Sequence, residues 1–225
     1  MPEARRATLF SVFPEELSAK LFADAKPVKL AADEVLFLAG DPGDGCYRLD
    51  QGLLKVSMIA ASGAERILAI IGPGGIVGEL STIDGLTRSA SVAALRDSEL
   101  TFVSRGAFTA FAEQHPEVYR YLVTLLATRL RGADSVLAAG SFLPLKGRVA
   151  RALLDLSEAF GQDVGQGRIL IRQKLSQSDV AAMAGIAREN VSRILNDWIR
   201  DKLVSRLSGY YCLENKAKLK RESAL

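Results

Sequence analysis

The segment from Leu175 to Leu213 constrains the fold of this chain more than any other feature of the sequence. Ser176 precedes Asp179 by three residues, the spacing of a shortened capping box at the start of a helix. Gly185 is suited to end that helix in a left-handed conformation, and a second helix is expected from about Ala187 to Asp201. Two short helices joined by a tight glycine turn predict a helix-turn-helix.

The residues after this helix pair predict a wing. Leu203–Arg206 and Tyr210–Leu213 flank Ser208-Gly209, a pattern typical of a β-hairpin. The last residues, Glu214–Leu225, are highly charged, and we expect them to be frayed.

The residues before the helix pair complete a basic C-terminal part. Gly147–Phe160 has the apolar spacing of an amphipathic helix, Gly161–Gly167 is expected to be a loop, and Arg168–Arg172 alternates like a strand. Residues 144–225 contain 15 basic and nine acidic side chains, a net charge of +6, whereas residues 1–143 carry −3. A basic part on an otherwise acidic protein fits either contact with a polyanion or a solvated basic face.

The early residues of the second helix are candidates for reading DNA, because such a helix presents its first turns to base edges in the major groove. Arginine can pair with O6 and N7 of guanine, and glutamate can accept from the cytosine amino group. The candidate base-reading residues are Arg188, Glu189, Asn190, Ser192 and Arg193. Ser176, Gln177 and Ser178 are expected to contact phosphate. The alternative is a surface ion pair between Glu189 and Arg193, worth only ~0.3–0.5 kcal/mol.

The N-terminal half has a different pattern. Residues 14–24 read as a short helix, and from Val28 to Val103 short apolar segments alternate with glycine-rich turns. The expected strands are Val35–Leu38, Tyr47–Asp50, Leu53–Ala60, Arg66–Ile71, Ser91–Ala94 and Leu100–Val103. Many short strands at regular spacing predict a small antiparallel barrel or β-roll, so the chain as a whole is expected to be α+β.

One stretch of this half, Gly72–Ser91, has the composition of a phosphate cradle. Four glycines fall in its first seven residues, Glu79 is an isolated acid, and Arg88 and Ser89 follow nine and ten residues later. Glycines allow close backbone approach, and arginine can pair with an anionic phosphate. The alternative is a simple ion pair between Glu79 and Arg88.

A long helix is expected from His115 to Phe142, followed by a break and hinge at Gly140–Pro144. Apolar residues recur along it at alternating steps of four and three, which predicts a seam with a second long helix. The seam residues are Tyr119, Val123, Leu126, Leu130, Ala133 and Leu137. This stripe either forms a dimer or packs on the chain's own barrel. We favour the dimer, since the adjacent stripe of Leu122, Leu125 and Val136 can face the barrel.

Several classes of function are disfavoured by composition. Two isolated cysteines, Cys46 and Cys212, predict neither a disulfide framework nor an iron–sulfur cluster. The single histidine, His115, argues against a multi-histidine metal site, and a cupin-like metalloenzyme would need histidines between residues 28 and 103. We therefore expect no metal, no haem and no enzymatic activity. No apolar run approaches the ~18 residues needed to span a bilayer, and no signal peptide is evident, so a cytoplasmic protein without membrane contact is expected.

Taken in order, the chain resembles the CRP/FNR family of bacterial transcription regulators over nearly its whole length. The most specific matches are Gly78-Glu79-Leu80, then Arg88-Ser89-Ala90, and then Ala187-Arg188-Glu189-Asn190-Val191-Ser192-Arg193-Ile194-Leu195. Gly147-Arg148-Val149-Ala150 is similar to the family as well. The resemblance implies a β-roll effector domain over residues 1–114, a dimerisation helix over 115–142 and a winged helix-turn-helix domain over 144–225.

The resemblance also implies roles for individual residues. In members that bind cyclic nucleotide, the glutamate that matches Glu79 takes the ribose 2′-hydroxyl, and the residues that match Arg88 and Ser89 hold the cyclic phosphate. Hydroxyl residues on the long helix contact the base, and here those positions hold Ala133 and Asp134, with Ser135 next. The implied nucleotide site therefore comprises Gly78, Glu79, Leu80, Arg88, Ser89, Asp134 and Ser135.

The implied function is a homodimeric regulator gated by cyclic AMP, with palindromic double-stranded DNA and RNA polymerase as partners. Ala133 cannot hydrogen-bond and ionised Asp134 can only accept, so cyclic GMP, another effector or independence from nucleotide stay open as alternatives. A haem sensor in this family uses an N-terminal proline and a histidine, but His115 lies outside the Gly72–Ser91 stretch.

Overall fold

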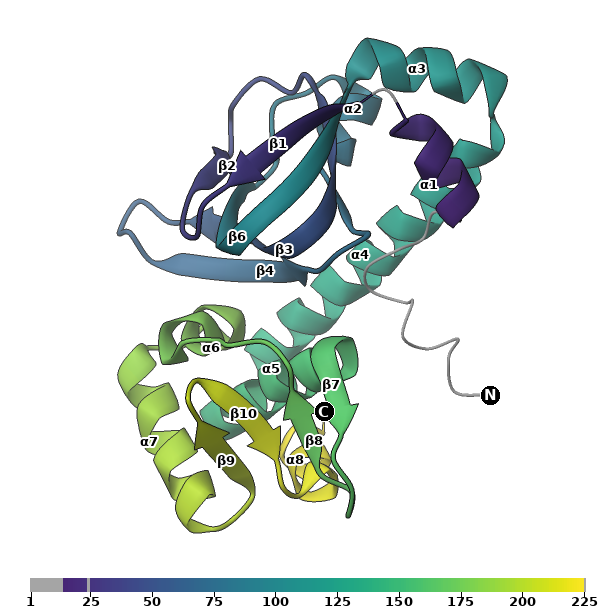
Figure 1. Cartoon of the computed structure of the whole chain (residues 1–225). Coiled ribbons are helices and arrows are strands. Elements are labelled where there is room, and N and C mark those ends of the chain that lie inside the picture. Colours follow the sequence, from purple (N-terminus) through teal and green to yellow (C-terminus); the bar gives the residue numbers. More distant parts are fainter. Residues whose placement is uncertain (1–13, 24, 225) are drawn as a thin grey trace. The chain divides into compact units, whose positions relative to one another are not determined.

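The computed structural model describes residues 14–23 and 25–224, and the chain divides into two compact units (Figure 1). The first unit is Met1–Arg131 and the second is Gly132–Leu225. Their boundary in the sequence falls within the long helix α4 (Glu117–Phe142). Within the described residues, no helix combines the length and hydropathy needed to cross a lipid bilayer.

The first unit is built on an antiparallel six-stranded sheet, as the sequence predicts (Figure 1). The strands are β1 (Lys26–Leu30), β2 (Val35–Phe37), β3 (Gly45–Ile59), β4 (Glu65–Ile71), β5 (Ile76–Val77) and β6 (Ser91–Ser104). The order β1-β6-β3-β4 forms the main path, while β2 pairs with β6 and β5 pairs with β3. Apolar residues from β3 and β6, including Leu49, Leu54, Val92 and Leu100, fill the interior of this β-roll.

The two longest strands correct the expectation of many short ones. Gly52 was expected to separate two strands, but β3 continues through it with shifts in register against β6 on either side. Gly52 has φ +102°, and a Cβ there would lie 2.6 Å from the carbonyl oxygen of Asp97. The glycine therefore allows a bulge and a close approach of two strands instead of ending one.

Four helices pack against this sheet: α1 (Glu15–Leu21), α2 (Glu79–Asp84), α3 (Arg105–Gln114) and the first part of α4. Helix α3 was not expected, and the long helix begins at Glu117 instead of His115. His115 is the C-terminal cap of α3, and Pro116 follows it. Because proline disfavours a helical conformation in the residue before it, the chain breaks here into two helices.

The apolar residues of α4 divide only partly as predicted. Leu122 and Leu125 are buried, Leu122 in the core cluster of the first unit, but Val136 is half-buried and lies in the second unit. Most of the predicted seam is exposed: Tyr119, Val123, Leu130 and Leu137 are 47%, 64%, 64% and 71% exposed, Ala133 is exposed too, and Leu126 is half-buried. The stripe therefore does not pack on the chain's own barrel.

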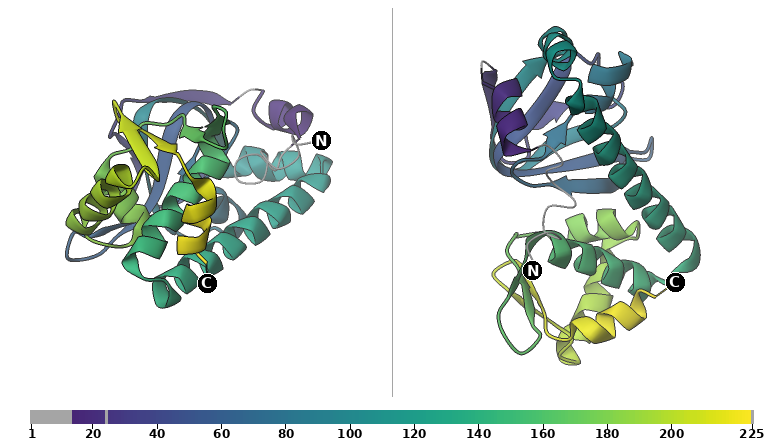
Figure 2. Two further views of the ribbon diagram at one scale, coloured as in Figure 1. Left: turned by 90° about the horizontal axis from the view of Figure 1, so that it is seen from below. Right: turned by 90° about the vertical axis from the view of Figure 1, so that its right-hand side faces the viewer.

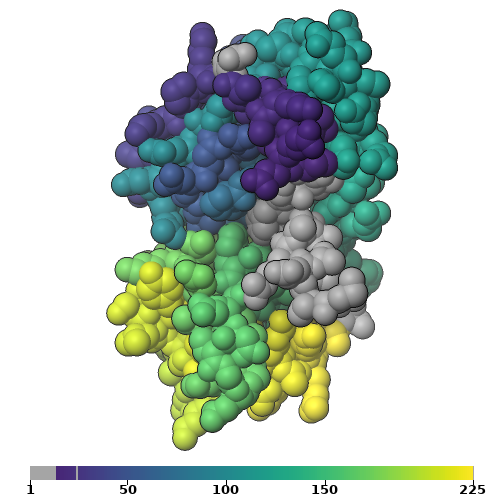
Figure 3. Space-filling view, turned by 45° about the vertical axis from the view of Figure 1, so that its right-hand side comes forward, coloured from purple at the N-terminus to yellow at the C-terminus, as the bar shows by residue number. Residues whose placement is uncertain are grey.

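The second unit combines four helices after α4 with a four-stranded antiparallel sheet in the order β7-β8-β10-β9 (Figure 2). Its elements are α5 (Leu145–Phe160), β7 (Gly161–Asp163), β8 (Ile169–Ile171), α6 (Gln177–Ala184), α7 (Arg188–Arg200), β9 (Val204–Leu207), β10 (Tyr210–Leu213) and α8 (Lys216–Glu222). In the face drawn in Figure 3, segments from across this unit, in green through yellow, reach the surface.

The helix-turn-helix has the local chemistry that the sequence predicts. Ser176 Oγ accepts from the backbone N–H of Asp179 at 3.1 Å, and Asp179 Oδ2 accepts from the N–H of Ser176 at 2.8 Å, which completes the capping box. Gly185 ends α6 with φ +64°. Helix α7 buries Val191 and other apolar residues on one face and exposes its polar face.

The wing is a tight hairpin of β9 and β10. Ser208 and Gly209 connect the strands with φ +50° and +87°, the two positive values that a type I′ turn requires.

Two other expectations for the second unit were wrong. Gly161–Asp163 is strand β7 and not loop, because it pairs with β8.

The expectation that Glu214–Leu225 would be frayed was also wrong, because these residues contain helix α8. Asn215 Oδ1 caps its first turn by accepting from the N–H of Lys218 at 2.9 Å. Leu219 is fully buried, and α8 packs along α5 (yellow beside green, left view of Figure 2). One buried leucine and one cap hold a segment whose composition is otherwise charged.

The junction between α4 and α5 occurs where proline and glycine predict a break. Helix α4 ends at Phe142 and Pro144 is the N-cap of α5. Arg148 donates from Nε to the carbonyl oxygen of Leu143 at 3.0 Å and from Nη2 to that of Gly140, so its side chain satisfies carbonyls at the end of α4.

Candidate functional site

A pocket in the first unit brings together five of the predicted nucleotide-binding residues. It holds about 340 Å³ of space between the side chains when its open mouth is counted. It is lined by Phe37, Val56, Val77, Gly78, Glu79, Leu80, Ser81, Arg88, Ser89, Ala90, Val92 and Arg129. The pocket thus has an apolar floor from the β-roll and a polar rim from helix α2 (Glu79–Asp84), the residues around Arg88, and α4.

Gly78 gives this pocket a close backbone approach. Its φ of +81° is left-handed, and an added Cβ would lie 3.1 Å from the carbonyl oxygen of Gly45 and would collide with Nη1 of Arg88. Only glycine therefore allows the Arg88 guanidinium to lie directly against this turn.

Arg88 is a buried cation whose position is fixed by many acceptors. Its Nη1 donates to the carbonyl oxygens of Gly45 at 2.7 Å and Gly78 at 3.0 Å, and to Oγ of Ser81 at 2.7 Å. Nη2 pairs with Oδ1 of Asp44 at 2.9 Å, while the Arg88 side chain is only 2% exposed.

Two features of Arg88 fit a bound anion. Its Nε is buried and has no hydrogen-bond partner among the described residues. Its partner Asp44 is 68% exposed, so the buried charge is compensated by one carboxylate in contact with solvent. A buried arginine with a spare donor on a pocket wall can form a charge-assisted hydrogen bond to a phosphate.

Glu79 is the buried acid of the pocket, and it pairs with Arg129 of α4 instead of Arg88. Nη1 of Arg129 donates to Oε1 of Glu79, and Nη2 donates to the carbonyl oxygen of Ile76. The alternative interpretation, a Glu79–Arg88 ion pair, is therefore wrong, because each residue has another partner. The pocket presents a carboxylate and two guanidiniums to its contents.

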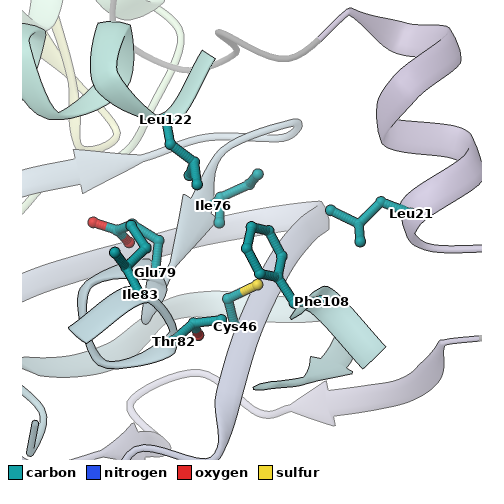
Figure 4. A pocket seen from close by; sticks show the side chains of 8 residues that line it. All are labelled: Leu21, Cys46, Ile76, Glu79, Thr82, Ile83, Phe108 and Leu122. Atoms are coloured by element: carbon teal, nitrogen blue, oxygen red, sulfur yellow. The ribbon is translucent and has the colours of Figure 1, made fainter. Parts of the chain in front are cut away.

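An apolar cluster lies behind Glu79, as Figure 4 shows. Cys46, Phe108 and Leu122 line it together with Ile76, while the Glu79 carboxylate points away from them. Burial, with a further contribution from the charge of Glu79, raises the pKa of the Cys46 thiol to about 12. The thiol is therefore protonated at neutral pH and behaves as a small apolar side chain.

The two predicted base-contact residues lie further along α4, in the second unit, and do not line this pocket. Asp134 is exposed. Ser135 is half-buried, and its Oγ accepts a hydrogen bond from Nη2 of Arg151 at 2.6 Å.

The predicted base-reading side chains lie on the first two turns of α7. Arg188, Glu189 and Arg193 are exposed, while Asn190 and Ser192 are partly buried. In the described part of the chain, the ion pairs of α7 join Arg200 to Asp197 and Asp201, and none joins Glu189 to Arg193. The exposed polar face of α7 is thus free to contact another molecule.

Of the three residues predicted to contact phosphate at the start of α6, Ser176 is used by the capping box instead. The hydroxyl of Ser176 donates to Asp179 at 2.7 Å as well as accepting from its N–H, so the capping box uses it fully. Gln177 is half-buried and Ser178 is exposed, which leaves these two side chains for contact with phosphate.

The sequence interpretation missed three polar residues of this site: Ser81 and Arg129, which line the pocket, and Asp44, which pairs with Arg88. Arg129 had a signal in the sequence, because it lies four residues after Leu125 and seven after Leu122 and so shares their face of α4. Ser81 and Asp44 bond to Arg88 across 7 and 44 residues of sequence. No local pattern marks those two.

Two protein families match this chain, one in each half of the sequence. The cyclic nucleotide-binding domain family matches residues 27–115, and the Crp-like helix-turn-helix domain family matches residues 147–222. The chain is 32% identical over 200 residues to a CRP-like cAMP-activated global transcriptional regulator of Mycobacterium tuberculosis, covering 87% of this chain and 89% of the relative. The chain belongs to the CRP/FNR family. It is a DNA-binding transcription regulator with a cyclic nucleotide-binding domain.

A second relative and a solved structure illustrate the range of similarity. The Cyclic AMP receptor protein of Thermus thermophilus is 36% identical over 177 residues, covering 79% of this chain and 74% of the relative. The solved structure of FixK2 from Bradyrhizobium japonicum superposes with a TM-score of 0.79 at 21% identity, covering 89% of this chain and 98% of that one. At that identity the structural likeness concerns the fold alone.

Proposed function

We propose that this regulator is a homodimer whose DNA binding is gated by cyclic AMP held in the β-roll pocket. The observation that carries the proposal is Arg88, which lines the pocket, is 2% exposed and has an Nε without a hydrogen-bond partner among the described residues. Burying an arginine beside a single solvent-exposed carboxylate is costly, and a ligand phosphodiester would offset part of that cost.

The other pocket residues have roles that suit the same ligand. Arg88 would neutralise the cyclic phosphate, and Ser89 would donate a hydrogen bond to it. Glu79 would accept from the ribose 2′-hydroxyl, as the resemblance implies, and the apolar floor would cover one face of the sugar and base. The names of two relatives, a CRP-like cAMP-activated global transcriptional regulator and a Cyclic AMP receptor protein, support this ligand.

The DNA-binding part of the proposal rests on α7 and on the seam of α4. Two copies joined along the exposed seam would present two recognition helices, and a palindromic site with half-sites one turn apart, ~34 Å, would match them. Arg188, Glu189, Asn190, Ser192 and Arg193 are the proposed base-reading residues. Ligand binding would shift the dimer toward the DNA-competent arrangement, in which we expect RNA polymerase as a further partner.

Titration of the full-length protein with cyclic AMP and with cyclic GMP tests the gating. We expect calorimetry to detect cyclic AMP binding, and anisotropy of a labelled operator, selected from a random DNA library, to show tighter DNA binding in its presence. Absence of heat with both nucleotides would rule out gating and leave a DNA-binding regulator with another effector.

Cyclic GMP is the second candidate, because Asp134 stands at a position where the family places a hydroxyl. An ionised carboxylate can accept from both N1–H and the N2 amino group of guanine, which adenine cannot match. A preference for cyclic GMP that disappears in Asp134→Ser would establish this alternative, whereas a preference for cyclic AMP in both proteins would exclude it.

A further inference from the structure

Arg151 of α5 forms a two-pronged contact at the end of α4 that neither the family resemblance nor the sequence pattern assigns. Its Nη2 donates to Oγ of Ser135 on α4 at 2.6 Å. Its Nε donates to Oδ1 of Asp155, one turn further along α5, at 3.0 Å. A single guanidinium therefore connects the side chain of one helix to a carboxylate on the next.

This contact differs in kind from the other bond between the two helices. Arg148 reaches the backbone carbonyls of Gly140 in α4 and of Leu143 just after it, which any residue at those positions would supply. Arg151 reaches a side-chain hydroxyl, so its contact depends on the identity of residue 135. The planar guanidinium holds donors on separate nitrogens in fixed directions, whereas the three donors of a lysine ammonium radiate from one nitrogen and do not hold that geometry.

At one end of the contact, Arg151 forms an ion pair with Asp155 on its own helix. Burial and, more weakly, the charge of Glu158 raise the pKa of Asp155, the Arg151 guanidinium opposes them, and the net pKa is about 6. Arg151 thus favours the ionised form of Asp155. This anchors one side of the guanidinium to α5 and leaves the other side to reach Ser135.

The Ser135 hydroxyl, at the other end of the contact, would move with any shift or rotation of α4. A serine hydroxyl has one proton to donate and two lone pairs, and Arg151 uses one lone pair. Ser135 lies six residues after Arg129 on the same helix, a rise of about 9 Å. Arg129 pairs with Glu79 in the nucleotide pocket. A shift or rotation of α4 set by the pocket would therefore move the hydroxyl that Arg151 binds.

We propose that Arg151 is a positioning residue that transmits the state of α4 to the helix-turn-helix through its bond to Ser135. Helix α5 packs against both α6 and α7 within the second unit, so the placement of α5 on α4 sets the placement of the recognition helix. The signalling role of this contact rests on the proposed gating by nucleotide. The bond itself also sets DNA affinity when no nucleotide is added.

A double-mutant cycle in the full-length dimer tests this. Ser135→Ala and Arg151→Met each remove the bond from one end, and the double variant removes both ends. We expect each single variant to change operator affinity without nucleotide by at least threefold in the same direction, and the double variant to change it no further. Arg151→Lys, which keeps the ion pair but loses the fork, should behave like Arg151→Met.

The matched control is Glu158→Gln, which removes an exposed carboxylate from the same helix, leaves both ends of the Arg151 contact in place and should leave operator affinity within about twofold. Additive effects of the two single variants, or an operator affinity unchanged while the melting temperature falls, would overturn the proposal. The measurement without nucleotide decides the role of the bond even if calorimetry finds no nucleotide binding. If nucleotide does bind, the ratio of operator affinities with and without cyclic AMP should move toward one in both single variants.

Discussion

Arg88 illustrates how one side chain can serve both the fold and the ligand site. It donates to two backbone carbonyls and a serine hydroxyl and pairs with Asp44, so Arg88→Ala would remove four hydrogen bonds from one region at once. We expect that substitution to destabilise the first unit by about 2–4 kcal/mol, since one hydrogen bond to a charged group contributes ~1.5–3 kcal/mol. Loss of nucleotide binding in Arg88→Ala would therefore be ambiguous.

Arg88→Lys separates the two roles. Lysine keeps the charge and can satisfy some of the carbonyls, but it lacks the fork needed to hold the fold and the phosphate together. We expect urea denaturation to show a smaller loss of stability than in Arg88→Ala, and calorimetry to show cyclic AMP affinity reduced at least tenfold. Arg105→Lys, an exposed arginine outside the pocket, is the control and should bind as the parent does. Equal affinity in Arg88→Lys and Arg105→Lys would show that Arg88 does not contact the phosphate.

Cys46 allows a second test at this scale. Burial raises the pKa of its thiol to about 12, so the fraction present as reactive thiolate at pH 8 is negligible in the folded protein. Cys212 is half-buried, and its pKa is raised by partial burial and by Glu214. We expect a thiol reagent to label Cys212 first and Cys46 only as the protein unfolds. Cys212→Ser should then lack the fast phase, and a fast phase that survives in this variant would contradict the burial of Cys46.

At the scale of elements, the capping box of α6 is a local device whose contribution can be measured alone. Ser176→Ala removes the hydroxyl that accepts from Asp179, and we expect it to lower the free energy of unfolding of the second unit by ~1 kcal/mol. Ser178→Ala, in the same turn but without a capping bond, should cost less than about 0.5 kcal/mol. Urea denaturation followed by circular dichroism compares the two, and equal losses would mean that the box does not stabilise α6.

Elements with strong local signals could be predicted from the sequence, and the exceptions share a cause. The capping box, Gly185 and the Ser208-Gly209 turn lie within a few residues of what they determine, and each was found correctly. Helix α8 was missed because its stability depends on burying Leu219 against α5, about 70 residues earlier in the chain. The pairing of Glu79 with Arg129 spans 50 residues and is equally invisible to a local pattern.

At the scale of the whole molecule, the exposed seam of α4 is the feature that the isolated chain leaves unexplained. Leu130 and Leu137 are 64% and 71% exposed on one stripe of a 26-residue helix. Exposed leucines at heptad spacing on a long helix are stabilised when a second helix covers them. A dimer joined there would also present two recognition helices to one operator. A substitution that prevents dimerisation should therefore also weaken operator binding.

Leu130→Glu places a charge in the middle of this seam and should yield a folded monomer. We expect sedimentation equilibrium to give the mass of one chain in place of two, and affinity for a palindromic operator to fall at least a hundredfold, because each half-site is then bound independently. Affinity for a single half-site should change much less, since α7 is untouched. Leu68→Glu, at a 46%-exposed leucine of β4 outside the seam, controls for added surface charge and should remain dimeric. A dimer that survives Leu130→Glu with full operator affinity would place the subunit contact elsewhere on the chain.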